Sequence, residues 1–433
     1  MEDILIINGH IIDPASKFDG IANVLVRDGN VERIGDDVFS DSAETIDAEG
    51  LVVCPGFVDL HCHLRQPGQE YKETIATGTL AAAHGGFTTV CAMPNTLPPL
   101  DNRIMATYTM DMIRKDAAIR VLLVGCISRG RRGEELADMA ELAGCGVVGF
   151  SDDGAPVASA RIMRRAMDYS IPLNVPIMEH CEERELSENT YMNEGIIATR
   201  LGLAGAPAAA EDIAVSRNIR LAELTGAHLH VTHVSTSGAV ELIRAAKTKR
   251  AHITAEVTPH HLTLSEERVM MYDTRCKVNP PLRTLNDIEA LIEGLLDGTI
   301  DAIATDHAPH SATDKECEFA VAAAGISGFE TAFGSLMKLV HAGRLPLSLL
   351  ISKLTFGPAQ VLGNKWSTLG RLVPGGPADI VLLSPDRKWQ VDTGKFVSRG
   401  KNTPLHGENL QGMVMLTMCD GKIIYRNEGT GIC

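Results

Sequence analysis

The chain is poor in aromatic residues and in positive charge, and both shortages narrow the functions to consider. Phe, Trp and Tyr make up 4% of the 433 residues, whereas hydrophobic residues of all kinds make up 45%, enough for a large core. Lys and Arg number 40 against 55 Asp and Glu, which gives a net charge of -15. Because an acidic chain repels polyanions, we expect neither nucleic acid nor an anionic membrane as a partner.

Several motifs are also missing. No basic leader opens the chain at Met1-Glu2-Asp3, and no apolar run approaches the length that spans a membrane. The ten cysteines never form a CxxC pair, so we expect reduced and mostly buried thiols. No GxxxxGK[ST] loop for phosphate occurs. We therefore expect a cytoplasmic protein.

Both ends of the chain are predicted to be rich in β-strands. The expected strands lie at 4–7, 23–26, 31–34, 379–383, 413–417 and 421–425. Asn8-Gly9 and Asp28-Gly29 follow or separate β-branched runs and are hairpin signals. We predict that residues 1–54 and 361–433 form the two parts of one flanking β-sandwich.

The middle of the chain, residues 55–360, repeats a rhythm of strand, loop and helix. Eight strands are predicted at 57–60, 88–93, 119–126, 146–151, 173–179, 227–232, 252–257 and 300–305. Helices are predicted between and after them, among others at 134–143, 211–225, 239–247 and 348–354. Eight alternations over about 250 residues predict an α/β fold, a parallel (β/α)8 barrel of the TIM type. A doubly wound open sheet is the alternative.

Ligand-type side chains gather where five of these strands end, which in such a barrel is where the chemistry lies. They are His61, His63, Asp153, His180, His233 and Asp306. Residues two apart in a strand face the same way, so His61 and His63 should reach one ion together. Four histidines and two carboxylates exceed the three ligands of one catalytic zinc. The surplus predicts two metals that share a bridging ligand and a water.

Each of these residues also has an ordinary explanation. Asp153 precedes a glycine, a common turn pair, and His180 could pair with a neighbouring glutamate at the surface. His233 could be a core histidine with its hydrogen bonds satisfied. Asp306 has the strongest individual case, because a charged residue after the apolar strand 300–305 would be costly if buried unpaired. We assign Asp306 as the carboxylate that takes a proton from water and passes it to the leaving nitrogen.

The motifs around these residues resemble those of class I dihydroorotases in the amidohydrolase superfamily. They are Asp59-Leu60-His61-Cys62-His63-Leu64-Arg65, Met93-Pro94-Asn95-Thr96, Ser151-Asp152-Asp153-Gly154, Lys277-Val278-Asn279-Pro280-Pro281-Leu282-Arg283 and Asp306-His307-Ala308-Pro309-His310. The resemblance runs through nearly the whole chain. It implies a zinc enzyme that interconverts N-carbamoyl-L-aspartate and L-dihydroorotate in pyrimidine (UMP) biosynthesis.

The resemblance also implies a role for each residue. Two Zn²⁺ per subunit would be held by His61 and His63 on one side, His180 and His233 on the other, Asp153 as the bridge, and Asp306 as ligand and acid/base. The substrate would contact His63, Arg65, Asn95, Asn279, His310 and the backbone at Ala324 and Gly325. A guanidinium fork suits the substrate carboxylate better than an ammonium does. The family often has a bulkier residue or proline just ahead of that glycine, where three alanines stand here.

Two other functions are weighed against this one. Relatives that act on other cyclic amides (dihydropyrimidinase, hydantoinase or allantoinase) commonly bridge their metals with a carboxylated lysine from strand four. No lysine occurs here between Lys115 and Lys247. A non-catalytic homologue that scaffolds aspartate carbamoyltransferase would have lost metal ligands, and none is lost. We therefore expect a dihydroorotase, a homo-oligomer with a dimer as the first expectation, and consider association with aspartate carbamoyltransferase.

Overall fold

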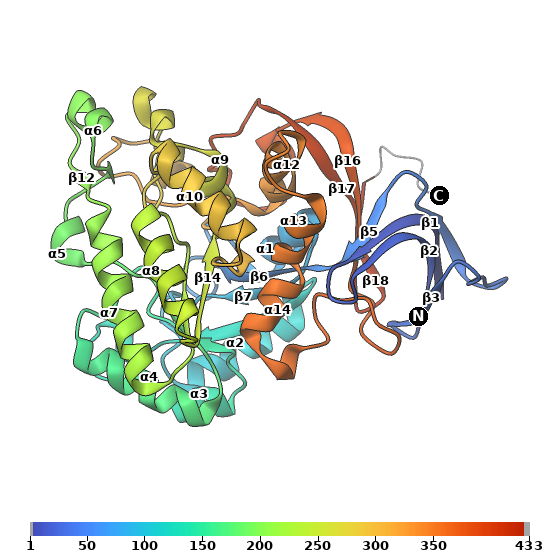
Figure 1. Ribbon diagram of the computed structural model, residues 1–433, viewed down its shortest axis with the longest axis horizontal. Coiled ribbons are helices and arrows are strands. Elements are labelled where there is room, and N and C mark those ends of the chain that lie inside the picture. The colour runs from blue at the N-terminus through green and yellow to red at the C-terminus, as the bar shows by residue number, and fades with distance from the viewer. Residues whose placement is uncertain (1–2, 428–433) are drawn as a thin grey trace.

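A computed structural model describes residues 3–427 as a barrel of strands and helices beside a curved sheet (Figure 1). The strands are β1 Ile4–Asp13, β2 Phe18–Arg27, β3 Asn30–Gly35, β4 Glu44–Asp47, β5 Val52–Pro55, β6 Phe57–Cys62, β7 Phe87–Ala92, β8 Arg120–Gly125, β9 Gly149–Phe150, β10 Ile177–Glu179, β11 Met192–Asn193, β12 Gly205–Ala206, β13 Leu229–Val231, β14 Ile253–Val257, β15 Ala302–Ile303, β16 Ile380–Gln390, β17 Asn409–Cys419 and β18 Lys422–Arg426. The helices are α1 Ile75–His84, α2 Arg103–Asp116, α3 Met139–Gly144, α4 Ala160–Leu173, α5 Arg184–Ser187, α6 Ile196–Leu201, α7 Ala209–Thr225, α8 Ser237–Thr248, α9 Pro259–Thr263, α10 Leu285–Leu296, α11 Ala312–Lys315, α12 Ala332–His341, α13 Leu347–Leu354 and α14 Phe356–Leu362.

Eight parallel strands form the barrel, in the order β6-β7-β8-β9-β10-β13-β14-β15. The seam between the first and the last strand is closed by the C-terminal end of β6 and the segment that follows β15. There Cys62 forms a parallel bridge with His307, and the His63 amide donates to the His307 carbonyl at 2.9 Å. This closure confirms the predicted TIM-type barrel over an open sheet.

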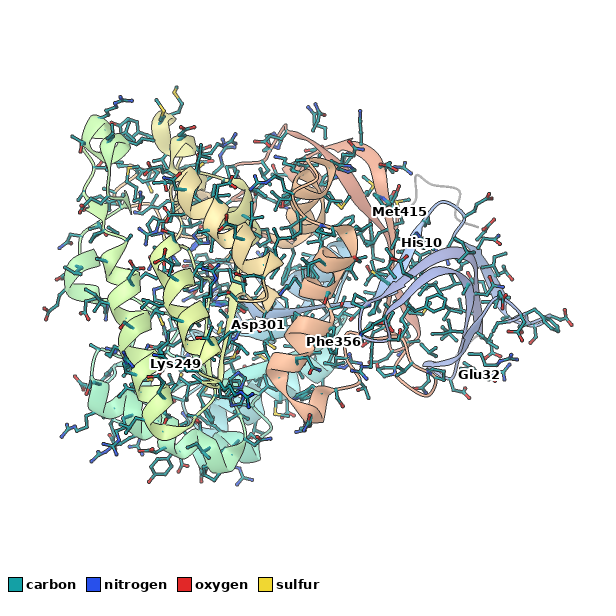
Figure 2. All side chains as sticks on the ribbon, viewed as in Figure 1. His10, Glu32, Lys249, Asp301, Phe356 and Met415 are labelled. Carbon is teal, nitrogen blue, oxygen red and sulfur yellow. The ribbon has the colours of Figure 1, made fainter. Side chains whose placement is uncertain are left out.

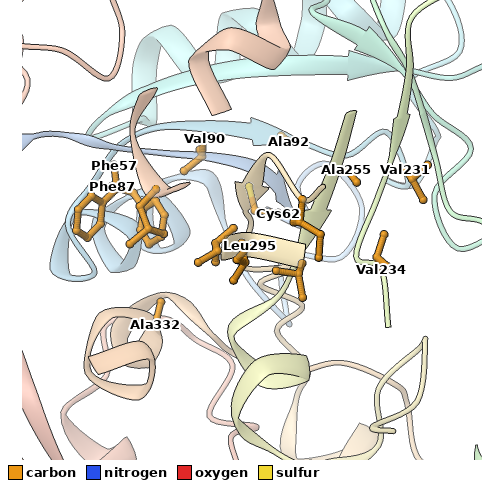
Figure 3. Packing of buried hydrophobic residues seen from close by; sticks show 14 of the residues in the cluster. Phe57, Cys62, Phe87, Val90, Ala92, Val231, Val234, Ala255, Leu295 and Ala332 are labelled. Carbon is orange, nitrogen blue, oxygen red and sulfur yellow. The ribbon is translucent and has the colours of Figure 1, made fainter. Parts of the chain in front are cut away.

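The barrel strands are buried on both faces, as expected of a parallel sheet covered by helices. Every residue of β6 and β7 is buried. Phe57 and Phe87, one from each of these strands, pack edge to face with ring centroids 5.6 Å apart (Figure 3). Val58 and Leu60 belong instead to the cluster that includes Met178, β15 and α14. The strands therefore pack against a separate hydrophobic cluster on each face.

The two ends of the chain build one eight-stranded sheet, in the order β18-β17-β16-β5-β1-β2-β3 with β4 paired to β1. It curls around a core to which both ends contribute, for example Ile4 and Val24 from one and Ile380 and Leu416 from the other. Figure 2 shows side chains filling the space that the curved strands enclose. This arrangement confirms the flanking β-sandwich made from both chain ends.

The Asn8-Gly9 hairpin prediction is wrong, whereas the Asp28-Gly29 prediction is correct. β1 continues through Asn8, where its register with β2 shifts in a bulge and Asn8 adopts a φ of 61°. Asp28 and Gly29 have φ of 48° and 81° and connect the antiparallel pair β2 and β3. Both sites use a left-handed residue, so the dipeptide alone does not separate a bulge from a turn.

Several boundaries in the barrel also differ from the prediction: the strands expected at 146–151 and 300–305 are as short as Gly149–Phe150 and Ala302–Ile303, and two starts are further off. The strand expected from Leu173 begins only at Ile177, because Leu173 is still the last residue of α4. The helix expected over 134–143 begins only at Met139, where the Asp138 side chain caps it by accepting from a backbone amide.

The described cysteines are all free thiols and most of them are buried, as predicted. Among residues 3–427, no helix combines the length and the apolar character needed to cross a membrane.

Candidate metal centre and active site

Asp153, just after β9, lies among all four of the predicted histidines. Its Oδ1 is 3.3 Å from His61 Nε2, 3.5 Å from His233 Nε2 and 3.8 Å from His180 Nδ1. Its Oδ2 is 3.6 Å from His63 Nε2. The structure therefore brings the ends of four barrel strands together around one carboxylate.

Asp306 lies against the pair His61 and His63, and His180 lies against His233. Asp306 Oδ1 is 3.0 Å from His63 Nε2 and 3.7 Å from His61 Nε2. His180 Nδ1 and His233 Nε2 are 2.9 Å apart. Two sets of three side chains each have ligand atoms that lie within 4.8 Å of one another. One set is His61, His63 and Asp306, and the other is His61, Asp153 and His233. All six predicted ligands meet at one end of the barrel.

The His61 ring is arranged as a metal ligand would be. Its Nδ1 lies 3.0 Å from Glu256 Oε1, and because a carboxylate can only accept, Nδ1 carries the proton. In the neutral ring, which is the form that binds a metal, Nε2 then presents a lone pair; this atom is fully buried and has no hydrogen-bond partner. An imidazole nitrogen left unpaired beside two carboxylates is a donor set that suits a divalent metal. The residues present therefore fit a metal site.

His180 resembles His61 in having one nitrogen engaged away from the centre. Its Nε2 lies 3.1 Å from Glu182 Oε2, which leaves Nδ1 facing His233 and Asp153. The alternative pairing with a neighbouring glutamate is therefore present. It does not exclude a ligand role, because the ring is buried and its second nitrogen points into the cluster.

Asn95, after β7, connects His63 to Asp153. Its Oδ1 lies 2.9 Å from His63 Nδ1, and its Nδ2 donates to Asp153 Oδ2 at 3.2 Å. His63 Nδ1 therefore carries the proton, and Nε2 is left for the centre. The amide nitrogen carries two N–H groups, so Asn95 can hold Asp153 and still donate to a substrate carboxylate.

The two carboxylates at the centre are held in their charged form. Burial alone would raise the pKa of Asp306, but the hydrogen bond with His63 and the neighbouring imidazoles hold that pKa below its ordinary value. Burial likewise opposes ionisation of Asp153, yet His61 and His233 bring its pKa well below the ordinary value. Both side chains are thus available as anionic ligands or proton acceptors.

The two adjacent aspartates after β9 have different environments. Asp152 accepts from the amides of Ile127 and Ser128 at 2.9 and 3.1 Å, and burial raises its pKa to about 6. It fixes the preceding loop rather than the cluster. Arg131 donates to the backbone carbonyl of Asp153. The sequence does not reveal this contact, since the arginine stands in an ordinary-looking loop.

Three non-glycine residues of the site adopt left-handed backbone conformations. Arg65, His233 and Asp306 have φ of 60°, 34° and 44°. Such conformations cost about 1–3 kcal/mol each and persist where the surroundings fix them. Ahead of Asp306, Thr305 is held by Asp59, whose carboxylate accepts from its amide at 2.8 Å and its hydroxyl at 2.7 Å.

Asp59 and Glu256 are site residues that the sequence analysis misses. Both are fully buried, and burial raises the pKa of Asp59 to about 7. For Glu256, burial is outweighed by hydrogen bonds with His230 and His61, which lower its pKa to about 2. The available signal is an acidic residue inside a strand that is otherwise predicted to be buried.

Arg65 and Lys72, with a neutral His310 between them, form a cationic corner beside the cluster. Lys72 Nζ lies 3.2 Å from His310 Nδ1, and an ammonium only donates, so Nδ1 accepts. His310 Nε2 then donates to the Ala324 carbonyl at 2.8 Å and cannot also accept from Arg65. Arg65 Nε donates to the Pro309 carbonyl at 3.2 Å, which aims the rest of the guanidinium fork. This corner can bind a carboxylate.

The other predicted substrate contacts lie at the rim of the site. Asn279 Nδ2 is 3.4 Å from His180 Nε2 and 3.5 Å from Glu182 Oε2. Gly325 has a φ of 142°, and an added Cβ there would lie 2.7 Å from Ala308 Cβ and 3.1 Å from His310 Nε2. Both segments therefore border the cluster and the cationic corner.

A third group of metal-type side chains, Asp379, Cys419 and Asp420, lies where the barrel meets the curved sheet. The guanidinium of Arg120 donates to both aspartates. The cluster is thus an ion-pair contact between the barrel and the sheet.

Comparisons with known sequences point to one family. A family model described as dihydro-orotase-like matches residues 50–239. A curated dihydroorotase of Caldanaerobacter subterraneus subsp. tengcongensis is 49% identical over 424 residues, covering 98% of this chain and 97% of the relative. That of Syntrophus aciditrophicus is 46% identical over 427 residues, covering 98% and 100%.

Solved structures share the fold. An L-hydantoinase (dihydropyrimidinase) from Arthrobacter aurescens aligns with a TM-score of 0.89 and 26% identity, over 98% of this chain and 96% of that one. A dihydropyrimidinase from Brevibacillus agri aligns with a TM-score of 0.86 and 23% identity, over 98% and 95%. The second likeness supports the barrel-and-sheet architecture alone.

Proposed function

The chain belongs to the dihydroorotase family, hydrolases that act on cyclic amides, and we propose that it interconverts L-dihydroorotate and N-carbamoyl-L-aspartate. The observation that carries the proposal is the cluster around Asp153 with the cationic corner of Arg65, Lys72 and the neutral His310 beside it. Metal-type ligands and a carboxylate-binding fork within one site match a substrate that has both a cyclic amide and a carboxylate.

We propose that the cluster holds two Zn²⁺. The ligands would be the imidazole and carboxylate atoms that converge, from His61, His63, Asp153, His180, His233 and Asp306. When bound, the metals would supply Lewis-acid chemistry, lowering the pKa of water and polarising a carbonyl. The buried, unpaired Nε2 of His61 supports this proposal.

Asp306 is proposed as the group that moves the proton. In the hydrolytic direction its carboxylate accepts a proton from the water that attacks the ring amide carbon. It then delivers that proton to the ring nitrogen as the carbon–nitrogen bond breaks. The reverse sequence closes the ring. Its lowered pKa provides the carboxylate form that the first step needs.

Arg65 is proposed to bind and orient the substrate carboxylate. Its Nε is held by the Pro309 carbonyl, so the remaining N–H groups are presented in a fixed direction. A fork that is fixed before binding loses little entropy when the carboxylate arrives. His310, and the backbone at Ala324 and Gly325, would complete this side of the pocket, with His63, Asn95 and Asn279 on the other sides.

A hydantoinase or dihydropyrimidinase activity is the alternative, since the solved structures named above bear those names. Such a relative would be expected to bridge its metals with a carboxylated lysine from strand four. No lysine is present between Lys115 and Lys247, so Asp153 is the bridging ligand that we propose. Arg65 beside the cluster also favours a substrate with a carboxylate.

One experiment tests both the proposed substrate and the proposed two-metal site. The purified chain is assayed on dihydroorotate, hydantoin, dihydrouracil and allantoin, and its metal is counted in the same sample. We expect turnover of dihydroorotate alone, at about two zinc ions per chain. Turnover of another cyclic amide in its place would support the alternative. Less than one zinc per chain in active protein would rule out the two-metal site.

Other features stay predictions. We propose that the protein is a cytoplasmic homodimer, and we consider association with aspartate carbamoyltransferase. Sedimentation of the purified chain, with and without that enzyme, would test the dimer and the association. The division of the chain into units 1–54, 55–360 and 361–433 is likewise proposed. It is supported by the way β1 to β5 and β16 to β18 share one sheet.

A further inference from the structure

A line of polar side chains runs inside the barrel along β13 and β14. The apolar residues of both strands belong to the hydrophobic cluster that packs against the helices. Because successive residues of a strand face opposite sides, His230, Thr254 and Glu256 face the barrel interior. His230 and Glu256 are completely buried, so any hydrogen bond that they lack would be costly.

Four hydrogen bonds join these three residues to His228 at one end and to His61 at the other. His228 Nε2 and His230 Nδ1 lie 2.8 and 2.9 Å from Thr254 Oγ1. His230 Nε2 lies 3.0 Å from Glu256 Oε2, and His61 Nδ1 lies 3.0 Å from Glu256 Oε1. We call this series of five residues the relay.

The relay crosses the barrel from its N-terminal to its C-terminal end. His228 precedes β13 and stacks on His252, with ring centroids 4.0 Å apart. Both line a cavity of about 370 Å³ at the N-terminal ends of the strands. His61 lies at the C-terminal end of β6, in the metal-type cluster. Residues at the floor of the barrel are thus hydrogen-bonded in series to a proposed metal ligand.

With neutral imidazoles, the relay has one consistent arrangement of protons. The Glu256 carboxylate accepts at both oxygens, so His61 Nδ1 and His230 Nε2 are both donors. His230 Nδ1 must then accept, and the Thr254 hydroxyl donates to it. The Thr254 oxygen in turn accepts from His228 Nε2. Each link therefore fixes the proton position of the next.

The neighbourhood of His228 supports this direction. Burial, together with the adjacent His252, lowers the pKa of His228 to about 3, so the ring stays neutral and can donate a single proton to Thr254. Nothing in this arrangement requires a group to titrate.

We infer that His230 and Thr254 are positioning residues for the metal centre, which act through Glu256 to fix the tautomer and orientation of His61. This inference rests on the proposed metal site. A neutral His230 without its Thr254 partner can move its proton to Nδ1, and its Nε2 lone pair would then face the Glu256 carboxylate. Glu256 would lose one of its two donors, and the His61 ring would lose part of its restraint.

The test compares zinc affinity in two variants, Thr254→Val, which keeps the volume and loses the hydroxyl, and Thr254→Ser, which keeps the hydroxyl and loses a methyl group. Zinc binding is measured by competition with a chromophoric chelator, and thermal unfolding of the metal-free protein is recorded beside it. Loss of outer partners of a metal ligand typically weakens metal binding by about 10–100-fold. For this more distant link we expect about a tenfold loss in Thr254→Val and wild-type affinity in Thr254→Ser.

A second set of variants separates the relay from general packing. His230→Gln keeps a donor near the Nε2 position and should retain zinc affinity, whereas His230→Leu should lose about tenfold or more. His252→Ala, which alters the floor without breaking a relay hydrogen bond, is the control and should bind zinc normally.

Three outcomes overturn the inference. If Thr254→Val and His230→Leu hold zinc as tightly as the wild type, the relay does not position His61. The same conclusion follows if affinity falls only in parallel with the unfolding temperature of the metal-free protein, in His252→Ala as well. A wild-type chain that binds no zinc overturns the proposed metal site together with the relay. Normal wild-type binding with unaffected variants overturns the relay alone.

Discussion

At the scale of single residues, the site depends on which nitrogen of each imidazole carries the proton. Three of the four histidines have one nitrogen engaged by an oxygen outside the centre, which leaves the other nitrogen directed inward. These pairs are His61 with Glu256, His63 with Asn95, and His180 with Glu182. The outer partners thus prepare a set of lone pairs around Asp153 before any ion binds.

Removing the Asp306 carboxylate should abolish turnover. We expect kcat on dihydroorotate to fall by about a thousandfold or more in Asp306→Ala, because general acid–base catalysis contributes 10²–10⁴-fold. Asp306→Asn is the matched variant, since Asn tolerates the left-handed φ at this position and keeps one oxygen. Both variants should show the wild-type circular dichroism spectrum. A kcat near that of the wild type in either would contradict the acid/base role.

Arg65→Lys should raise KM for dihydroorotate by about tenfold with a smaller change in kcat. A lysine replaces the two parallel hydrogen bonds of a fork by one, and a charged hydrogen bond is worth about 1.5 kcal/mol or more. Steady-state kinetics measures the split between the two constants. Arg129→Lys, at an exposed loop position, is the control. An unchanged KM would show that the substrate carboxylate binds elsewhere.

At the scale of elements, the strand ends of the barrel are predictable and the links between them are not. The positions of His61, Asp153, His180 and Asp306 follow from the rule that parallel strands deliver their C-terminal residues to one face. By contrast, Glu256 contacts His61 from 195 residues away. No local pattern marks that pairing, because it depends on how far two non-adjacent strands are staggered around the barrel. The bulge at Asn8 has the same origin, since the choice between bulge and turn is made by the partner strand.

The loop that ends at Gly325 should be sensitive to a single methyl group. Gly325 has a φ of 142°, and an added Cβ would meet Ala308 Cβ at 2.7 Å and its carbonyl oxygen at 2.8 Å. Gly325→Ala must therefore shift the loop that places Ala324 against His310. We expect kcat/KM to fall by about tenfold or more, because small misplacements in a site are costly.

Gly298→Ala is the control for the loop. Its φ is 82°, so alanine is strained there too, but an added Cβ meets nothing within 4 Å. Its kcat/KM should be close to that of the wild type, with only a modest loss of stability. Equal activity in the two variants would show that the position of the loop at Gly325 does not affect the site.

At the scale of the whole molecule, barrel and sheet share one hydrophobic cluster and are joined by buried polar contacts as well. The chain passes from β5 to β6 through Gly56 alone, whose amide donates to the Asp379 carbonyl at 2.8 Å. Arg120 joins β8 to the sheet by donating to Asp379 and Asp420. Between these parts lies a cavity of about 260 Å³ that is lined by Glu330, Trp389 and other side chains. A buried acid at such a boundary makes stability depend on pH.

Glu330 should make the protein less stable as the pH rises from about 4.5 to 7. Burial is the main cause that raises the pKa of Glu330 from 4.5 to about 7, although the amides of Val397 and Ser398 donate to its carboxylate. The folded state therefore holds this proton more tightly than the unfolded state does. The resulting stabilisation is fully present below pH 4.5 and is lost as the pH rises through about 7. Glu330→Gln is neutral at every pH and lacks this loss.

The free energy of unfolding in urea, measured from pH 4.5 to 8, tests the sign. The difference between Glu330→Gln and the wild type should increase by about 2–3 kcal/mol over this range and then level off. A constant offset is expected as well, because the amide group of Gln must face one of the two backbone donors, and this offset does not vary with pH. Glu49→Gln, at an exposed position, should show no such increase. If the two variants have the same pH dependence, Glu330 is charged in the folded protein at neutral pH and the boundary between barrel and sheet tolerates a buried anion.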